Sequence, residues 1–300
     1  MRIFEEADYS LIPNRQKGYV FSAILLVLSV GSLAVRGLEL GIDFRGGMEF
    51  VVETPDRLSA TDVRTALEEP LESTPEGKRY GDQGLLIRTA PEGDISDVQN
   101  AIMQTIGQQF PQAQAKLIKT NVVGARFAED LARGALWSVL GSLLVIFIYI
   151  LVRFEWRFGL GAVAALFHDV TITLGIFSLL SDIAPFSLQI DQAIIAAFLT
   201  IVGYSLNDTV VVFDRIREYS NLFKTRPYNE IVNHSINTTL SRTVITSVTT
   251  LFVVTTLFIF GGEVLRGFSF ALIIGVLIGT YSSVFVASPV VVELRDRLES

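Results

Sequence analysis

The sequence predicts a polytopic α-helical membrane protein with six transmembrane helices and one small α/β domain of ferredoxin-like kind between the first two helices. Half of the 300 residues are hydrophobic, more than an ordinary soluble domain usually carries. Six apolar runs reach about 20 residues, the length that crosses a bilayer. A long polar interval after the first run alternates strand and helix signals, which predicts a folded domain there.

Short polar loops separate the six apolar runs, apart from the long interval after the first. The last run is long for one span, which predicts that it tilts or leaves the membrane early. No small-residue cleavage site follows the first run, so we expect an uncleaved anchor rather than a signal peptide. The runs cover residues 18–35, 135–152, 159–180, 192–213, 243–260 and 267–292.

Lys and Arg in the short loops fall almost entirely on one side of the predicted membrane. Because cytoplasmic loops carry the excess of Lys and Arg, both termini are expected in the cytoplasm and residues 36–133 in the periplasm of a bacterial inner membrane. The other side has only Arg266 in its short loops. The cytoplasmic set is Arg2, Arg15, Lys17, Arg153, Arg157, Arg215, Arg217, Lys224, Arg226, Arg295 and Arg297.

The sequence therefore divides into residues 1–35, a periplasmic α/β domain at 36–133, and a five-helix membrane bundle at 134–300. Within the domain, Ser59 and Asp62 resemble a helix capping box. A βαβαβ order of this kind predicts a ferredoxin-like sandwich, with turn-forming connections at 70–84 and 91–93. The expected strands are 48–53, 85–89 and 115–123, and the expected helices are 59–69 and 94–110, the latter aligning Ile95, Val98, Ile102 and Ile106.

Asp208 is the main candidate for function, because it lies inside the fourth apolar run. A charge at membrane depth costs about 2.5–3.5 kcal/mol on insertion scales, and such residues usually mark an ion path. Ser205 shares its helix face, and Asn207 adjoins it as polar support. We expect Asp208 to bind and release a proton. The alternative is a static hydrogen bond or ion pair between helices.

Arg242 begins the fifth apolar run and is a candidate counter-charge, since Arg stays protonated in proteins. Thr246 and Thr249 lie on the same helix face and could hold water. An interfacial anchor is an equally good interpretation of Arg242. Asp169, in the third run, is a weaker candidate for the proton pathway, with a structural role equally favoured. His168 beside it indicates little alone.

Two further patterns concern packing and the membrane boundary. Small residues at four-residue intervals in the last run predict a close helix contact, within the chain or with a partner: Ala271, Gly275, Gly279, Ser283 and Ala287. The segment GIDFRGG at 41–47 places Asp43 and Arg45 at the outer boundary. Its paired glycines, Gly46 and Gly47, suggest a tight turn or a close backbone approach.

The composition limits which metal, cofactor and catalytic sites the chain can carry. There is no cysteine, and His168 and His234 are the only histidines, so neither a metal site nor a cofactor is expected. A net charge of −7 argues against a nucleic-acid partner. The spans exclude a soluble enzyme. No nucleophile and base stand out as a pair for catalysis in the membrane.

Several motifs together resemble the SecF members of the SecD/SecF family of protein-export membrane proteins, within the resistance–nodulation–division superfamily. They are GIDFRGG, HDV at 168–170, VGYSLNDTVVVFDRIRE at 202–218, SINTTLSRTVITS at 235–247 and FGG at 260–262. The resemblance extends over nearly the whole chain. It implies that the family's proton-path aspartate maps onto Asp208 and its arginine onto Arg242.

The resemblance also implies partners and an energy source. Members pair with SecD, associate with the SecYEG channel in membrane lipid, and use the proton-motive force to promote translocation of unfolded exported polypeptide. Protons would then be the coupling ion, without chemical catalysis. Two alternatives remain: a proton-driven exporter of lipid or small molecules, and a scaffold that only stabilises a channel. The short external interval leaves little room for a substrate pocket, which favours assistance over pumping.

Overall fold

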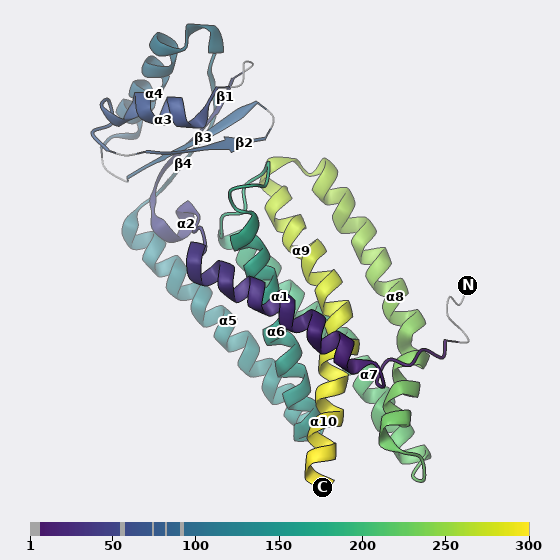
Figure 1. Ribbon diagram of the computed structural model, residues 1–300. Helices are drawn as coiled ribbons and strands as arrows, with labels where there is room; N and C mark the ends of the chain where they lie inside the picture. The colour runs from purple at the N-terminus through teal and green to yellow at the C-terminus, as the bar shows by residue number, and fades with distance from the viewer. Residues whose placement is uncertain (1–6, 55–57, 74, 82, 91–92, 300) are drawn as a thin grey trace. The chain divides into compact units, whose positions relative to one another are not determined.

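The computed structural model describes residues 7–54, 58–73, 75–81, 83–90 and 93–299, and Figure 1 shows its helices and strands. The chain forms two compact units. The helical unit comprises Met1–Leu38, Val139–Leu179 and Ile194–Ser300, and the α/β unit comprises Glu39–Ser138 and Leu180–Ala193. Each unit therefore contains segments that are distant in the sequence.

Six helices of the described residues are long and apolar enough to cross a membrane, in the order the sequence predicts. All are longer than their apolar runs, because helices continue past the hydrocarbon wherever the flanking residues pack or hydrogen-bond. They are α1 (Arg15–Arg36), α5 (Ala125–Arg153), α6 (Trp156–Leu180), α7 (Gln192–Leu222), α8 (Tyr228–Phe260), and a last span that joins α9 (Gly262–Ser282), a π-helical turn (Ser283–Ala287) and α10 (Ser288–Glu299).

Apolar and aromatic side chains form the core of the helical unit. Phe213 on α7 contacts Phe158 of α6, with ring centroids 4.9 Å apart, and Phe154, which lies between α5 and α6, at 6.2 Å. Ile150, Phe213, Val232 and Ile236 are fully buried there. Burial of a large aliphatic or aromatic side chain contributes about 1.5–3 kcal/mol, so this cluster holds α5, α6, α7 and α8 together.

The small residues of the last span pack against α7 of the same chain. A Cβ atom on Gly275 would overlap the Ile201 side chain, and one on Gly279 would lie 3.0 Å from the Ser205 Cβ. Ala271 and Ser283 are fully buried. At Gly275 and Gly279, the close helix contact is made within the chain.

The α/β unit contains a four-stranded antiparallel sheet in the order β2-β3-β1-β4. Its elements follow the βαββαβ order of the ferredoxin-like fold. Figure 1 shows α3 and α4 on the same face of the sheet. The elements are β1 (Gly47–Glu53), α3 (Ala60–Glu68), β2 (Glu76–Tyr80), β3 (Gly84–Thr89), α4 (Ile95–Gln109), a 3₁₀ turn (Pro111–Ala113) and β4 (Lys116–Val123), preceded by the short α2 (Ile42–Arg45).

Three details differ from the sequence prediction. Strand β2 was missed, because residues 70–84 were assigned to a turn-rich connection. Ile95 is 41% exposed and does not join Ile102 and Ile106 in the core, since it begins α4, where Asp94 caps the helix. The α/β unit also includes residues 180–193, which the sequence had assigned to a loop between spans.

Candidate functional site

Asp208 lies on the buried face of α7, with 4% of its surface exposed. Its Oδ2 atom has no hydrogen-bond partner among the described residues. Asn207, expected to support it, is exposed. Arg242 on α8 is near enough to influence Asp208 electrostatically, yet no ion pair joins the two in the described structure. The carboxylate is thus buried with one oxygen unsatisfied.

Arg242 lies on the exposed face of α8, as does Thr249. The Thr249 hydroxyl donates to Ile245 O of its own helix at 2.9 Å. The buried hydroxyls of α8 belong to another face. Ser247 Oγ lies 2.6 Å from Thr280 Oγ1 and accepts from Tyr204 at 3.4 Å. The predicted face of Arg242, Thr246 and Thr249 is therefore not the face that packs inside this chain.

Asp169 on α6 has far more hydrogen-bond partners than the sequence suggested. Only 1% of its surface is exposed. Its Oδ2 accepts from Ser205 Oγ on α7 at 2.6 Å and from Ser282 Oγ on α9 at 2.7 Å. Ser205 was expected to support Asp208, one turn along the same helix. The structure instead directs the Ser205 hydroxyl to Asp169.

His168 extends these contacts to the first helix. Its Nδ1 lies 2.9 Å from Asp169 Oδ1, and its Nε2 lies 3.0 Å from Ser22 Oγ on α1. Ser22 Oγ is 3.0 Å from the Tyr281 hydroxyl, which donates to Gly18 O at 2.8 Å. We call this set the Asp169 network: Ser22, His168, Asp169, Ser205, Tyr281 and Ser282.

The Asp169 network joins α1, α6, α7 and α9. Sequence analysis found Asp169 and His168 but could not pair them with hydroxyls from distant runs. A histidine next to an aspartate inside an apolar run was the available signal. Within the described part of the chain, no group of three or more His, Asp or Glu side chains is placed to hold a metal ion.

The GIDFRGG segment forms a tight connection in the α/β unit. Gly46 and Gly47 have φ values of 73° and 130°, backbone angles that residues other than glycine rarely adopt. A Cβ on Gly47 would lie 2.7 Å from Thr89 O. Asp43 Oδ2 accepts from the Gln192 amide at the start of α7, at 3.1 Å, and Arg45 pairs with Glu76 at 2.9 Å.

Comparison with known families agrees with the resemblance seen in the sequence. Residues 102–297 match the family described as protein export membrane protein SecD/SecF, C-terminal, and residues 31–54 match the SecD/SecF GG motif. The first match covers more than half of the chain. The chain belongs to the SecD/SecF family of protein-export membrane proteins.

Its relatives include proteins named protein translocase subunit SecF. The one from Rhodothermus marinus is 68% identical over 99% of this chain and 96% of its own length. The one from Haemophilus influenzae is 38% identical over 95% of this chain and 86% of its own. The SecD/SecF match thus extends along nearly the whole of both proteins.

Solved SecDF structures have the same fold. The crystal structure of SecDF from Thermus thermophilus, described as a translocon-associated membrane protein, superposes with a TM-score of 0.86 at 35% identity. A SecDF structure in a super-membrane-facing form gives 0.70 at 33% identity. They cover 99% and 98% of this chain, which spans only 40% of each SecDF chain.

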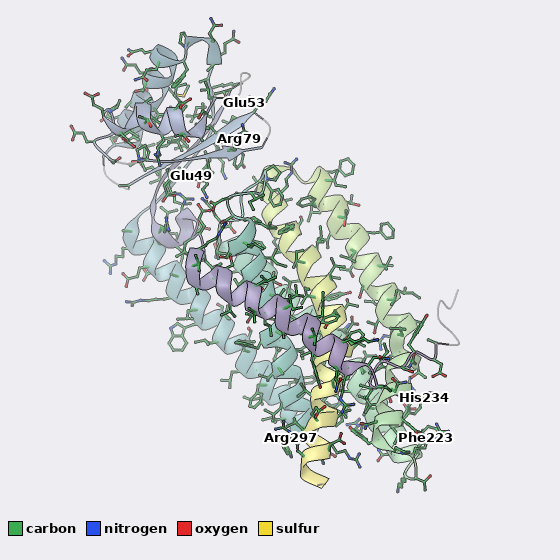
Figure 2. All side chains as sticks on the ribbon, viewed as in Figure 1. Glu49, Glu53, Arg79, Phe223, His234 and Arg297 are labelled. Carbon is green, nitrogen blue, oxygen red and sulfur yellow. The ribbon has the colours of Figure 1, made fainter. Side chains whose placement is uncertain are left out.

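One charged cluster beside the GG motif of this SecD/SecF protein was missed. Arg88 on β3 is 5% exposed and pairs with Glu49 of β1 at 3.0 Å; Figure 2 labels Glu49. Arg88 also donates to Gln189 in the 180–193 segment, and Gln189 donates to Glu39 at 2.9 Å. The cluster fastens this segment to the sheet. A charged residue within each of two apolar strands, Glu49 in β1 and Arg88 in β3, was the available sequence signal.

Proposed function

We propose that this chain is the SecF-type half of a protein-export complex that uses the proton-motive force to promote translocation of polypeptides across the inner membrane. Family membership supports the export role. The observation that carries the proton coupling is the buried carboxylate of Asp208, whose Oδ2 has no partner among the described residues. Protons are the coupling ion in this proposal.

An ionised carboxylate with an unsatisfied oxygen is costly away from water. Two events relieve that cost: a proton binds to Asp208, or a cation approaches it. Arg242 on α8 is the available fixed cation and already influences Asp208. Proton binding would therefore weaken the attraction between α7 and α8, and release would restore it. One charge moved through 100 mV provides about 2.3 kcal/mol, enough to bias two helix arrangements.

A SecD-type subunit is the expected partner. The solved SecDF chains contain more than twice the length matched by this chain. The SecYEG channel, an unfolded exported polypeptide and membrane lipid complete the proposed set. The exposed position of Arg242 on an apolar helix also supports a second half, because a cation that faces hydrocarbon is unfavourable.

The proposed orientation places both termini in the cytoplasm and the α/β unit in the periplasm, following the Lys and Arg distribution. The α/β unit would act on the emerging polypeptide mechanically. No chemical catalysis is proposed, since energy enters as proton movement rather than bond cleavage.

The decisive variant is Asp208→Asn, which keeps the side-chain size and removes titration. Membrane vesicles containing the complex are expected to lose the proton-dependent part of polypeptide translocation. Asp214→Asn is the matched control on α7, since Asp214 is exposed and pairs with Arg153 and Arg217. Its translocation should equal the unaltered chain. Full proton-dependent translocation by Asp208→Asn would favour the scaffold, and lipid transport without any effect on polypeptide would favour the exporter.

A further inference from the structure

We propose that the His168–Asp169 pair is a second proton-binding site, separate from Asp208, whose bound proton holds α1, α6, α7 and α9 together. The proposal stands on hydrogen-bond geometry in the helical unit. It does not depend on what the complex transports or on whether Asp208 titrates.

The hydrogen-bond directions follow from one fixed acceptor. Gly18 O can only accept, so the Tyr281 hydroxyl donates its single proton to it at 2.8 Å. Ser22 Oγ, 3.0 Å from the Tyr281 oxygen, must then donate to that oxygen. His168 Nε2, 3.0 Å from Ser22 Oγ, must in turn carry a proton and donate it. The tautomer of His168 is assigned by this chain of donors.

Asp169 determines the hydrogen-bond directions at the other end of the network. Both the Ser205 and Ser282 hydroxyls donate to its Oδ2, at 2.6 and 2.7 Å, so that oxygen is an acceptor. The remaining contact is His168 Nδ1 to Asp169 Oδ1, at 2.9 Å. One proton must lie in that contact, on either atom. The pair is therefore electrically neutral as a unit, either imidazolium with carboxylate or imidazole with carboxylic acid.

Removal of this proton destabilises the contact between His168 and Asp169. Two acceptor lone pairs would then face each other across 2.9 Å, and a net negative charge would remain in a site with 3% and 1% exposure of His168 and Asp169. Unpaired buried charge is costly. The pair relieves this cost when one ring or carboxyl group rotates away, which breaks the link to Ser22 on α1 or to the serines on α7 and α9.

No fixed cation takes the place of the proton. In the described part of the chain, no Lys or Arg side chain bonds to either member of the pair. On the surrounding helices, the titratable groups nearest in sequence to the network are Lys17 and Tyr19 on α1 and Tyr204 and Asp208 on α7, besides Tyr281 of the network itself. Tyr19 interacts with Arg15 and Glu293, and Tyr204 donates to Ser247. Arg242 of α8 is exposed. The proton itself is thus the charge that neutralises Asp169.

Helices α1 and α6 pack so closely that their contacts should form or break together. A Cβ on Gly175 of α6 would overlap Ser29 of α1, and Ser32 Oγ lies 2.9 Å from Ser178 Oγ. Close-packed contacts of this kind are made or lost together rather than stretched. Loss of the His168–Ser22 bond would therefore loosen the helices and not only one side chain.

Protonation can be measured directly, because the chain has only two histidines. The full chain in lipid nanodiscs, labelled with ¹⁵N-histidine, is titrated over a range that includes about pH 5 to 8, where an unperturbed histidine changes charge. His234→Gln assigns the signals. We expect His168 to hold a proton on Nε2 at neutral pH and the pair to lose one proton as pH rises. An unprotonated Nε2 at neutral pH, or no change over this range, overturns the proposal.

Helix separation is measured by spin labels at Val35→Cys of α1 and Leu179→Cys of α6, both exposed positions in a chain without cysteine. Asp169→Asn mimics the protonated acid, because its amide can donate to Nδ1 while its oxygen accepts from both serines. We expect dipolar broadening to disappear at high pH in the unaltered chain, to persist at every pH in Asp169→Asn, and to be absent at every pH in His168→Phe.

Asp208→Asn separates this proposal from the proposed function. It should abolish proton-dependent export and leave the titration of the His168–Asp169 pair and the spin-label response unchanged. Two results would show that the pair is only a static structural contact. One is dipolar broadening that does not change with pH in the unaltered chain, and the other is broadening that changes with pH to the same extent in Asp169→Asn.

Discussion

A buried carboxylate is stable when its oxygens find donors, and the two aspartates of the helical unit differ in this respect. Asp169 receives two hydroxyl donors and faces His168. Asp208 is nearly as buried, yet its Oδ2 lacks a partner in the described structure. With its proton bound, the His168–Asp169 pair resists rearrangement, whereas the unsatisfied Asp208 carboxylate gains from it. On α7, helix attachment is thereby assigned to Ser205, which bonds Asp169 of α6, and coupled proton movement to Asp208, one turn away.

Ser205→Ala is expected to destabilise the helical unit by about 1.5–3 kcal/mol, the range for hydrogen bonds to charged groups. The loss arises because Asp169 Oδ2 keeps only the Ser282 donor. Thermal unfolding of the purified chain in detergent measures it. Thr200→Ala is the control on the same helix, since the hydroxyl of the exposed Thr200 donates to Ala196 O of its own helix. Its change should stay within about 0.5 kcal/mol, and equal effects of both variants would contradict the assignment.

Sequence alone located the important charges but not their partners. Asp208 and Asp169 stand out because ionisable groups in apolar runs are rare. Ser205 lies one turn from Asp208, so helix geometry suggested that pair, and only the packing of α6 against α7 redirects its hydroxyl. The face of α8 that contacts α9 was equally hidden, because hydroxyls occur all round that helix.

At the scale of elements, the small residues of α9 determine what Asp169 can reach. Gly275 and Gly279 are four residues apart, as are Ile201 and Ser205, which they contact on α7. Matching spacings let the two helices approach closely along one ridge. Ser282 follows Gly279 by three residues and so meets Asp169 on the same side. The close approach of α7 and α9 therefore provides both the packing contacts and the hydrogen bond from Ser282 to Asp169.

Gly275→Val should push α9 away from α7 and destabilise the chain by about 1–3 kcal/mol through overpacking. Reduced thermal stability in detergent and a lower yield of monodisperse protein are the readouts. Gly141→Val on α5 is matched in chemistry, and in the described structure the Cβ that it adds has no atom within 4 Å outside the adjacent residues and its own helix backbone. If Gly141→Val proves as harmful as Gly275→Val, loss of helical glycine rather than helix contact is responsible.

Element prediction failed where local signals were weak. Strand β2, EGKRY, lies at the sheet edge and carries three charged residues in five positions. Edge strands commonly carry charge, which protects them from pairing with other chains, but such composition resembles a loop. The apolar strands β1 and β3 and the amphipathic helices α3 and α4 were predicted because their burial leaves periodic hydrophobic residues.

At the scale of the whole molecule, the chain passes between its two units several times. Segment 180–193 belongs to the α/β unit, although it connects α6 and α7. The Arg88 cluster holds this segment to the sheet, and Asp43 of α2 accepts a hydrogen bond from its Gln192 amide. The helices that carry Asp169 and Asp208 are therefore joined covalently to the α/β unit.

The proposed orientation is testable with single cysteines, since the chain has none. Asp97→Cys lies in the α/β unit and Asp296→Cys near the C-terminus, both at exposed positions. A membrane-impermeant maleimide added to spheroplasts should label Asp97→Cys and leave Asp296→Cys unlabelled until the membrane is opened. The reverse labelling pattern would place the α/β unit in the cytoplasm.

Arg242 tests whether the chain is half of a larger assembly. Because Arg242 is exposed in the isolated chain, Arg242→Gln should leave that chain folded and lower its thermal stability only by the loss of the attraction to Asp208. In a complex with a SecD-type subunit, the same residue would be covered, and the variant should reduce the amount of that subunit that co-purifies in mild detergent. Arg215→Gln is the control, since Arg215 pairs with Glu218 of its own helix and should leave co-purification unchanged. A variant that unfolds the isolated chain, or one that leaves the complex intact, would show that this face of α8 is not where the second half binds.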